Sequence, residues 1–398
     1  MSIADKIAQR VKQISPSATM AMKLKAEELK AQGRDVLSFA VGEPDFPTPE
    51  NIIEAAKRAM DEGHTKYTAA SGTQEVKQAI VRAAERDLGL EYDTPQVLVS
   101  NGAKHSLMNL AMTLVDPGDE VIVFSPYWVT YPDQIRVAGG RPVVVETRGE
   151  GDFQPDLDEV RRALSSSTVA ILLNSPCNPS GAVYSREVME GLAEIALEHD
   201  LLIISDEIYK HIIFDDNRHI SPAMLGEDVK QRTIIVDGVA KSYSMTGWRI
   251  GWILGPEEVV KRAGALQGQS TSCPNTIAQQ ATIEALTGPQ ESVSEMCGQF
   301  QRRRDFVVER LSQMPDVTVA TPRGTFYAFP NMSGYYGRKL RGRAIEDSVG
   351  MAEYLLEEGL ISLVPGAAFG ADDYIRISFA ASMEELEVGL ARWAEALS

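Results

Sequence analysis

The feature that most constrains the fold is a series of short apolar runs that alternates with helical stretches. The runs are VLVS (97–100), EVIVF (120–124), RPVVVE (141–146), VAILLN (169–174), LLIIS (201–205), TIIVD (233–237) and WRIGWIL (248–254). Strands that are apolar throughout, with helices between them, are typical of a sheet that is covered on both faces. The pattern therefore predicts an α/β fold with a mainly parallel central sheet.

The chain of 398 residues is long for a single core, so we expect two domains. Residues 48–285 contain the apolar runs and should form the large, ligand-binding domain. A long helical stretch and shorter α+β segments follow residue 285. We expect residues 286–398 to form a smaller α+β domain together with residues 1–47.

Charge and cysteine content exclude several classes of protein. The net charge of −17 disfavours binding to nucleic acid. Cys177, Cys273 and Cys297 are far apart and form no disulfide framework, which favours reduced thiols in the cytoplasm. The first residues do not have the pattern of a signal peptide, and the sequence shows no apolar run long enough to span a bilayer, so we expect neither secretion nor a membrane partner. The five histidines lack metal-site spacing, so we expect no metal.

Polar residues stand directly after several of the apolar runs. Asn101–Gly102, Asn174, Asp206 and Gly238 occupy such positions. In open α/β sheets the ligand crevice lies at the carboxyl ends of the strands. Several strands should therefore bring polar groups to one edge of the sheet.

Lys241 follows one apolar run and Asp206 follows another. A buried lysine beside other cations loses its proton and can form an imine with an aldehyde cofactor. A buried carboxylate needs a positive partner, for which a protonated pyridine nitrogen would serve. Tyr209 could donate to the phenolate oxygen of such a ring. The alternatives are a surface lysine at position 241 and a helix N-cap at position 206.

Other candidates have ordinary structural interpretations beside functional ones. The turn Gly102–Lys104 would open a helix and offer backbone N–H groups to a phosphate. Trp128 could stack on a planar ring or belong to the core. Asn178 could be a turn residue. Arg376, inside an apolar strand, should pair with a structural acid or a substrate carboxylate.

Eight segments together resemble the class I pyridoxal-phosphate-dependent aminotransferases over nearly the whole chain. They are VGEPDF (41–46), KYTAASG (66–72), SNGAK (100–104), SPYWVTYP (125–132), NSPCNPSG (174–181), SDEIY (205–209), AKSYSMTGWRIG (240–251) and YIRIS (374–378). The Pro-Ser-Ala-Thr segment at 16–19 is similar to the bacterial aspartate aminotransferase branch. The resemblance implies the aspartate aminotransferase fold (fold type I), with pyridoxal 5'-phosphate bound by the large domain.

The resemblance also implies roles for single residues. Lys241 would carry the cofactor as a Schiff base, with Asp206 on the pyridine nitrogen and Tyr209 on the ring oxygen. Arg249 would hold the phosphate together with Gly102, Ala103 and Lys104. Tyr67 would reach the phosphate of a neighbouring subunit, which implies a homodimer with shared active sites. Trp128 would stack on the cofactor ring, and Asn178 would contact the ring oxygen. Substrate would be bound by Gly42, Trp128, Asn178 and Arg376, and its distal carboxylate by Lys104 and Thr19.

These roles predict ping-pong transamination between L-aspartate and 2-oxoglutarate. Two departures from the family pattern stand out. Ala240 and Gly238 replace serines that assist phosphate binding in many relatives, so the phosphate should depend more on Arg249. Ser15 stands where relatives that accept prephenate tend to have a basic residue, which disfavours that activity. The alternatives are a broad-specificity, aromatic or prephenate aminotransferase and, more remotely, a C–S lyase or a non-catalytic regulator with this fold.

Overall fold

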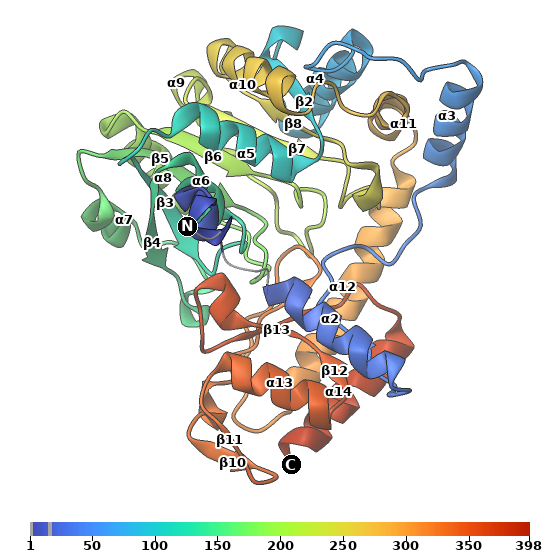
Figure 1. Ribbon diagram of the computed structural model, residues 1–398, viewed down its shortest axis with the longest axis vertical. Helices are drawn as coiled ribbons and strands as arrows, with labels where there is room; N and C mark the ends of the chain where they lie inside the picture. The colour runs from blue at the N-terminus through green and yellow to red at the C-terminus, as the bar shows by residue number, and fades with distance from the viewer. Residues whose placement is uncertain (1–2, 15–17) are drawn as a thin grey trace.

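The computed structural model describes residues 3–14 and 18–398, except for the side chains of residues 4, 18, 19 and 23. A seven-stranded sheet forms its centre, with the strand order β2-β8-β7-β6-β5-β3-β4 (Figure 1). The strands are β2 (Val97–Ser100), β3 (Glu120–Ser125), β4 (Arg141–Glu146), β5 (Thr168–Asn174), β6 (Leu202–Asp206), β7 (Thr233–Gly238) and β8 (Gly251–Leu254). Strand β8 runs antiparallel to both of its neighbours, β2 and β7, and the other neighbouring strands of this sheet pair in parallel. The predicted α/β fold with a mainly parallel sheet is confirmed.

The predicted strand at 248–254 is too long at its start. Residues Thr246–Trp248 form a turn of 3₁₀-helix, and Arg249 adopts the left-handed conformation with φ 58°. Strand β8 therefore begins only at Gly251. The irregular backbone before it turns the Arg249 side chain out of the sheet register.

Helices cover both faces of the sheet. On one face pack α5 (Ala103–Leu114), α6 (Tyr131–Ala138) and α10 (Glu257–Ser270), whose apolar residues share a core with Ile204 and Val236. The other face is covered by α3 (Glu50–Asp61), α4 (Gln74–Leu88), α7 (Leu157–Ala163), α8 (Arg186–Glu198), α9 (Glu227–Lys230) and α11 (Thr276–Thr287). This coverage explains why the strands are apolar on both sides.

A separate core unites the N-terminal and C-terminal parts of the chain. It contains residues of α2 (Ala18–Ala31), α13 (Ser348–Glu358), α14 (Met383–Leu397), β9 (Tyr327–Ala328), β12 (Ile361–Ser362) and β14 (Ile375–Ser378). Strand β1 (Leu37–Ser38) pairs in parallel with β12, and β14 lies between β9 and β13 (Val364–Pro365). The remaining strands, β10 (Arg338–Leu340) and β11 (Arg343–Ile345), form a hairpin.

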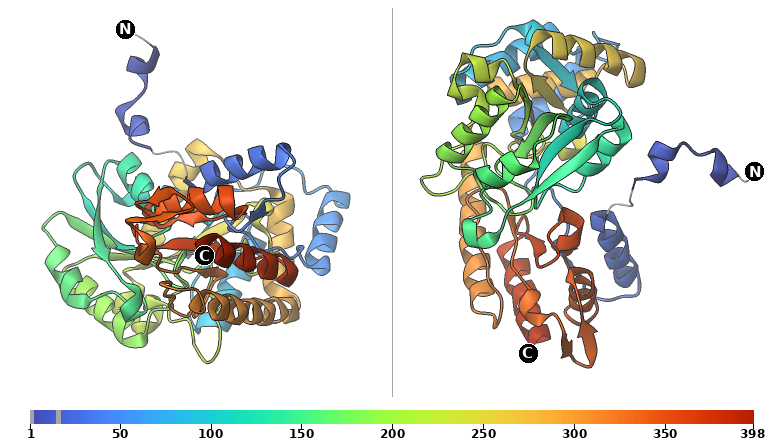
Figure 2. Two further views of the ribbon diagram at one scale, coloured as in Figure 1. Left: turned by 90° about the horizontal axis from the view of Figure 1, so that it is seen from below. Right: turned by 90° about the vertical axis from the view of Figure 1, so that its left-hand side faces the viewer.

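Helix α12 (Glu291–Ser312) connects the two regions. Val293 near its start packs in the core beside α4 and α11, whereas Phe300 and Val307 pack in the core of the terminal segments. The N-terminal segment extends from the body of the chain, and its short helix α1 (Gln9–Lys12) lies next to α6 (Figure 2). Within the described residues, none of the helices combines the length and apolar character needed to cross a membrane.

Candidate active site

A cavity of about 360 Å³ lies where the carboxyl ends of β5 and β6 meet the terminal segments. Its walls include ten of the residues predicted from the sequence, namely Gly42, Ala103, Lys104, Trp128, Asn178, Asp206, Tyr209, Lys241, Arg249 and Arg376. Segments that are up to several hundred residues apart therefore contribute to one site.

Lys241 projects into this cavity from the loop after β7. Its Nζ donates a hydrogen bond to Gly42 O at 2.6 Å. Burial lowers the pKa of Lys241 to about 8, and the guanidinium groups of Arg376 and Arg249 act in the same direction. At pH 7 about a tenth of this amine is therefore neutral, and the neutral amine is the form that reacts with an aldehyde.

Asp206 ends β6 and is almost completely buried. Its carboxylate accepts hydrogen bonds from Tyr131 Oη at 2.6 Å and from the Ile208 N–H at 3.3 Å. Residues after Asp206 form a turn rather than a helix, so the helix N-cap interpretation is wrong. Burial raises the pKa of Asp206 to about 6, although both hydrogen bonds oppose the rise. Among the described residues no cation forms an ion pair with Asp206, so its carboxylate can receive the positive charge of a ligand.

Arg376 also lines the cavity and is buried in β14. Its guanidinium donates to Asn178 Oδ1 at 3.0 Å and to Ala40 O at 2.6 Å, and it lies 4.5 Å from the centre of the Tyr327 ring. The Nε atom has no hydrogen-bond partner in the described part of the chain, and no carboxylate there forms an ion pair with Arg376. The structural acid considered for this arginine is thus absent from those residues, which leaves its charge for a ligand carboxylate.

The start of α5 and Arg249 form a positive pocket. Gly102 precedes the helix with φ 88°, and no side chain caps the helix N-terminus. A Cβ atom on Gly102 would lie 2.6 Å from Arg249 Nη2, so a side chain there would displace this guanidinium, and the positive φ also favours glycine. The helix N-terminus and Arg249 together make an anion site.

Lys104 and Trp128 form another wall. The Lys104 ammonium lies 4.7 Å from the centre of the Trp128 ring, and Trp128 meets Tyr131 edge to face at 5.5 Å. Because Tyr131 binds Asp206, this wall and the buried carboxylate are held together.

Two predicted residues, Gly102 and Tyr67, are not among the described residues that line the cavity, and the side chain of a third is not described. Gly102 lies just behind Ala103, where it makes room for Arg249. The Tyr67 side chain is 91% exposed. The Thr19 side chain, like residues 15–17, lies outside the described residues.

The sequence analysis assigned no role to five polar residues of the walls: Glu43, Tyr131, Asn174, Thr246 and Tyr327. Asn174 was visible as a polar residue ending an apolar run, and its Oδ1 accepts from the Asn178 N–H at 2.8 Å. No sequence pattern indicated Tyr327 as a site residue, because it lies in a segment that predicts only a short strand. Its hydroxyl lies 3.1 Å from Tyr209 Oη.

Comparison with known proteins decides the family. The model of the family "Aminotransferase class I and II" matches residues 34–392. The chain belongs to this family. The aminotransferase is 44% identical to the aspartate aminotransferase of Geobacillus stearothermophilus, over 97% of this chain and 98% of that one. It is also 44% identical to the aspartate/prephenate aminotransferase of Thermus thermophilus, over 98% of both chains. The crystal structure of the aspartate aminotransferase from Rhizobium meliloti matches with a TM-score of 0.95 and 40% identity, covering 98% of each chain.

Pyridoxal phosphate is the cofactor of this aminotransferase, as the resemblance implied. The cavity fits this group at three points. Asp206 offers a buried carboxylate that lacks a cation, Lys241 offers an amine with a lowered pKa, and the α5 N-terminus with Arg249 offers an anion site.

Proposed function

We propose that this aminotransferase moves an amino group between L-aspartate and 2-oxoglutarate in a two-stage ping-pong cycle. The observation that carries the proposal is the arrangement of two separate cations, Arg376 and Lys104, around the amine of Lys241 in one cavity. Relatives with the same overall length are named aspartate aminotransferases. One from Thermus thermophilus, 43% identical, has been solved with maleate, which is a dicarboxylate.

When bound, pyridoxal phosphate supplies an aldehyde that links to amines and a ring that accepts electrons. Lys241 would bind the aldehyde in the resting enzyme. When it is released from the aldehyde, the same amine would remove the α-proton of the amino acid and then deliver a proton to the cofactor carbon. A pKa of about 8 suits both the base and the acid role. Asp206 would keep the pyridine nitrogen protonated, and Tyr209 would donate to the ring oxygen.

The remaining residues would hold the cofactor and substrate in place. Arg249 and the 102–104 turn would bind the phosphate, and Trp128 would cover the ring. Arg376, steadied by Asn178, would bind the α-carboxylate with help from the backbone at Gly42. Thr19 and Lys104 would bind the distal carboxylate.

Replacing Lys104 with alanine tests the choice of substrate. A hydrogen bond to a charged group contributes about 1.5–3 kcal/mol, so kcat/KM for aspartate should fall by about 10- to 100-fold. Alanine and phenylalanine, which lack a distal carboxylate, should be much less affected. The control is Lys261→Ala, on the exposed side of α10, which should leave all three donors unchanged. An equal loss for all three donors in Lys104→Ala would contradict the assignment.

A second candidate is an enzyme that also accepts prephenate or aromatic donors. Relatives at 44–45% identity, from Thermus thermophilus and Cereibacter sphaeroides, are named aspartate/prephenate aminotransferases. A panel of amino donors with 2-oxoglutarate, and of prephenate with aspartate, separates the two. Incubation with aspartate alone separates transamination from lyase chemistry, because only transamination yields oxaloacetate and the aminated cofactor.

We further propose that the enzyme is a cytoplasmic homodimer with shared active sites. The exposed Tyr67 supports this assembly, because an aromatic ring that is 91% exposed on one chain is available to a second copy. The thiol content supports the cytoplasm, since none of the three cysteines forms a disulfide.

A further inference from the structure

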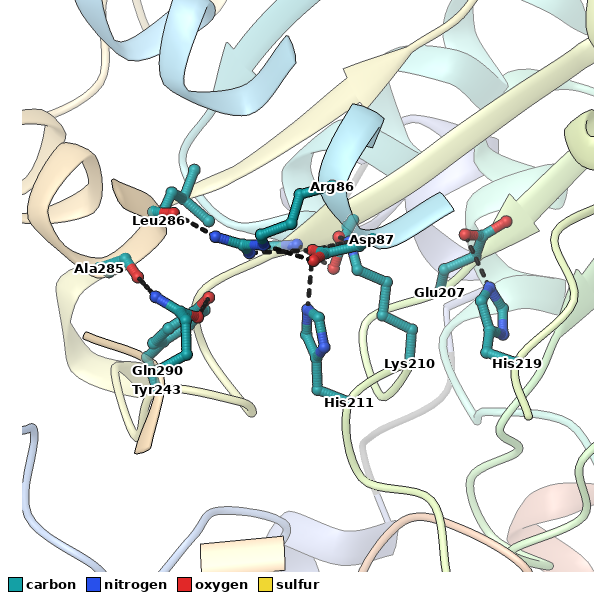
Figure 3. Close-up of polar contacts among 12 residues, drawn as sticks. Arg86, Asp87, Glu207, Lys210, His211, His219, Tyr243, Ala285, Leu286 and Gln290 are labelled. Atoms are coloured by element: carbon teal, nitrogen blue, oxygen red, sulfur yellow. Dashed lines mark hydrogen bonds and ion pairs between the residues drawn. The ribbon is translucent and has the colours of Figure 1, made fainter. Parts of the chain in front are cut away.

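A cluster of charged side chains lies behind the active site, on the opposite face of the sheet. Side chains alternate between the two faces along a strand. Asp206 shares its face with Ile204, which packs beside α5, whereas Asp237 shares its face with Ile235, which packs beside α4. Figure 3 shows part of this cluster, in which Lys210 and His211 approach Asp87 of α4.

Lys210 and Asp237 form the centre of the cluster. Lys210 Nζ donates to Asp237 Oδ2, and the two side chains are only 7% and 5% exposed. The carboxylate of Asp87 lies 4.0 Å from the same ammonium and 3.2 Å from His211 Nε2. Burial lowers the pKa of Lys210, but the Asp237 and Asp87 carboxylates outweigh it and leave the pKa raised. Burial also raises the pKa of Asp237, and the Lys210 ammonium and the Gly238 N–H oppose that rise. The direct contact of the ammonium with the carboxylate is the geometry of an ion pair.

This ion pair connects the two segments that carry the catalytic groups. Lys210 directly follows Tyr209, and Asp237 stands four residues before Lys241. The other carboxylate oxygen of Asp237 accepts from the Gly238 N–H at 2.7 Å. One carboxylate thus fixes both the end of β7 and the turn that holds Tyr209.

The end of β7 is also in tight contact with the anion site on the other face. Gly238 pairs with Gly251 of β8. A Cβ on Gly238 would lie 2.8 Å from Ile250 O, and one on Gly251 would lie 2.3 Å from Ala103 N. With so little free space, a shift of β7 would move the Gly102–Lys104 turn as well as Lys241.

We propose that Lys210 and Asp237 are positioning residues for the transamination, whose buried ion pair sets the places of Lys241 and Tyr209 relative to the cofactor. Stability alone is a weak reason for such a pair, because buried ion pairs are often no more stabilising than apolar replacements. An ion pair that joins two catalytic segments has another effect, because it favours one arrangement of these segments over others. The inference rests on the proposed function.

The test is the double variant Lys210→Met with Asp237→Asn. It removes both charges together, so that neither residue remains as a buried charge without its partner. Misplacement of reacting groups is costly, so kcat should fall by about tenfold or more, with KM for aspartate changed by less than about threefold. Cofactor should bind more weakly, and the visible circular dichroism of bound cofactor should change. In the cofactor-free protein, amides of residues 207–212 and 237–243 should exchange hydrogen faster than in wild type.

The matched control is the double variant Arg304→Met with Asp215→Asn, which removes another ion pair with a buried arginine, outside the cavity. It should keep wild-type kcat, cofactor affinity and circular dichroism. If the Lys210/Asp237 variant also keeps all of these and changes only thermal stability, the pair is merely structural and the proposal is overturned.

Two further outcomes are distinguishable. If the double variant does not fold, Asp237→Glu keeps the charge but displaces it by one methylene, and the same readouts decide. If wild type fails to transaminate aspartate, the proposed substrate is wrong, while cofactor affinity and hydrogen exchange still test the ion pair.

Discussion

Lys241 and Asp206 are both placed where their charged forms are disfavoured. Burial lowers the pKa of the lysine and raises that of the aspartate, so that the two values approach each other at about 8 and about 6. A bound cofactor that links to the amine and presents a protonated nitrogen to the carboxylate would relieve both costs. Without a bound cofactor, the site therefore lowers the stability of the protein. The free-energy cost of burying these two groups should be measurable in the cofactor-free protein.

Replacing Lys241 with methionine should stabilise the cofactor-free protein near pH 7, by about 3 kcal/mol. The folded pKa of about 8 lies below the ordinary 10.5, so the unfolded chain binds more protons between these values. Wild-type stability should consequently rise with pH across this window, and the difference from Lys241→Met should shrink. Urea unfolding at several pH values measures the difference in unfolding free energy between the two proteins. A difference that stays constant from pH 7 to 10.5 would contradict the lowered pKa of Lys241.

Single residues were predictable where a polar group ends an apolar run. Asp206 stands directly after such a run, and Lys241 and Asn178 follow other runs by four residues. Strand geometry brings their neighbourhoods together, whereas the family resemblance implied their roles. The partners of these residues were not predictable in the same way. Tyr131 reaches Asp206 from a helix 75 positions away, and Tyr327 reaches Tyr209 across 118 positions, so only tertiary packing reveals these contacts.

At the level of elements, the contact between β8 and α5 determines the shape of the anion site. The sequence predicted a strand through Arg249, but the backbone is left-handed at that residue and the strand starts two residues later. No apolar pattern records such a reversal. The division into residues 48–285 and the two terminal segments likewise remains a prediction, although α12 packs into two different cores along its length.

The variant Gly251→Ala tests the close contact of β8 with α5. Its Cβ would lie 2.3 Å from Ala103 N, so the strand must move away from the helix N-terminus. Overpacking of this kind costs about 1–3 kcal/mol, and we expect weaker cofactor binding together with lower stability. Gly264→Ala is the control, since its Cβ would meet only Leu98 Cδ1 at 3.7 Å and should stabilise α10 slightly. Wild-type cofactor affinity in Gly251→Ala would show that the contact does not shape the site.

At the level of the whole molecule, the placement of Tyr67 bears on whether one chain can form a complete active site. The cavity is lined by residues of one chain, yet the exposed Tyr67 ring is not among them. If a second copy receives this ring in its own phosphate site, each site needs Lys241 from one chain and Tyr67 from the other. Light scattering should then give a solution mass near twice the 43.5 kDa of the chain.

Mixed dimers distinguish a shared site from two independent ones. In a hybrid of a Lys241→Ala chain and a Tyr67→Ala chain, a shared arrangement puts both defects into one site and leaves the other site intact. Random exchange of equal amounts would thus restore about a quarter of the sites to wild type, because half of the dimers are hybrids. Activity at limiting cofactor, measured before and after refolding the two variants together, provides the readout. If Tyr67 served its own chain, every site would retain one defect, and mixing would give no more than the mean of the two variants.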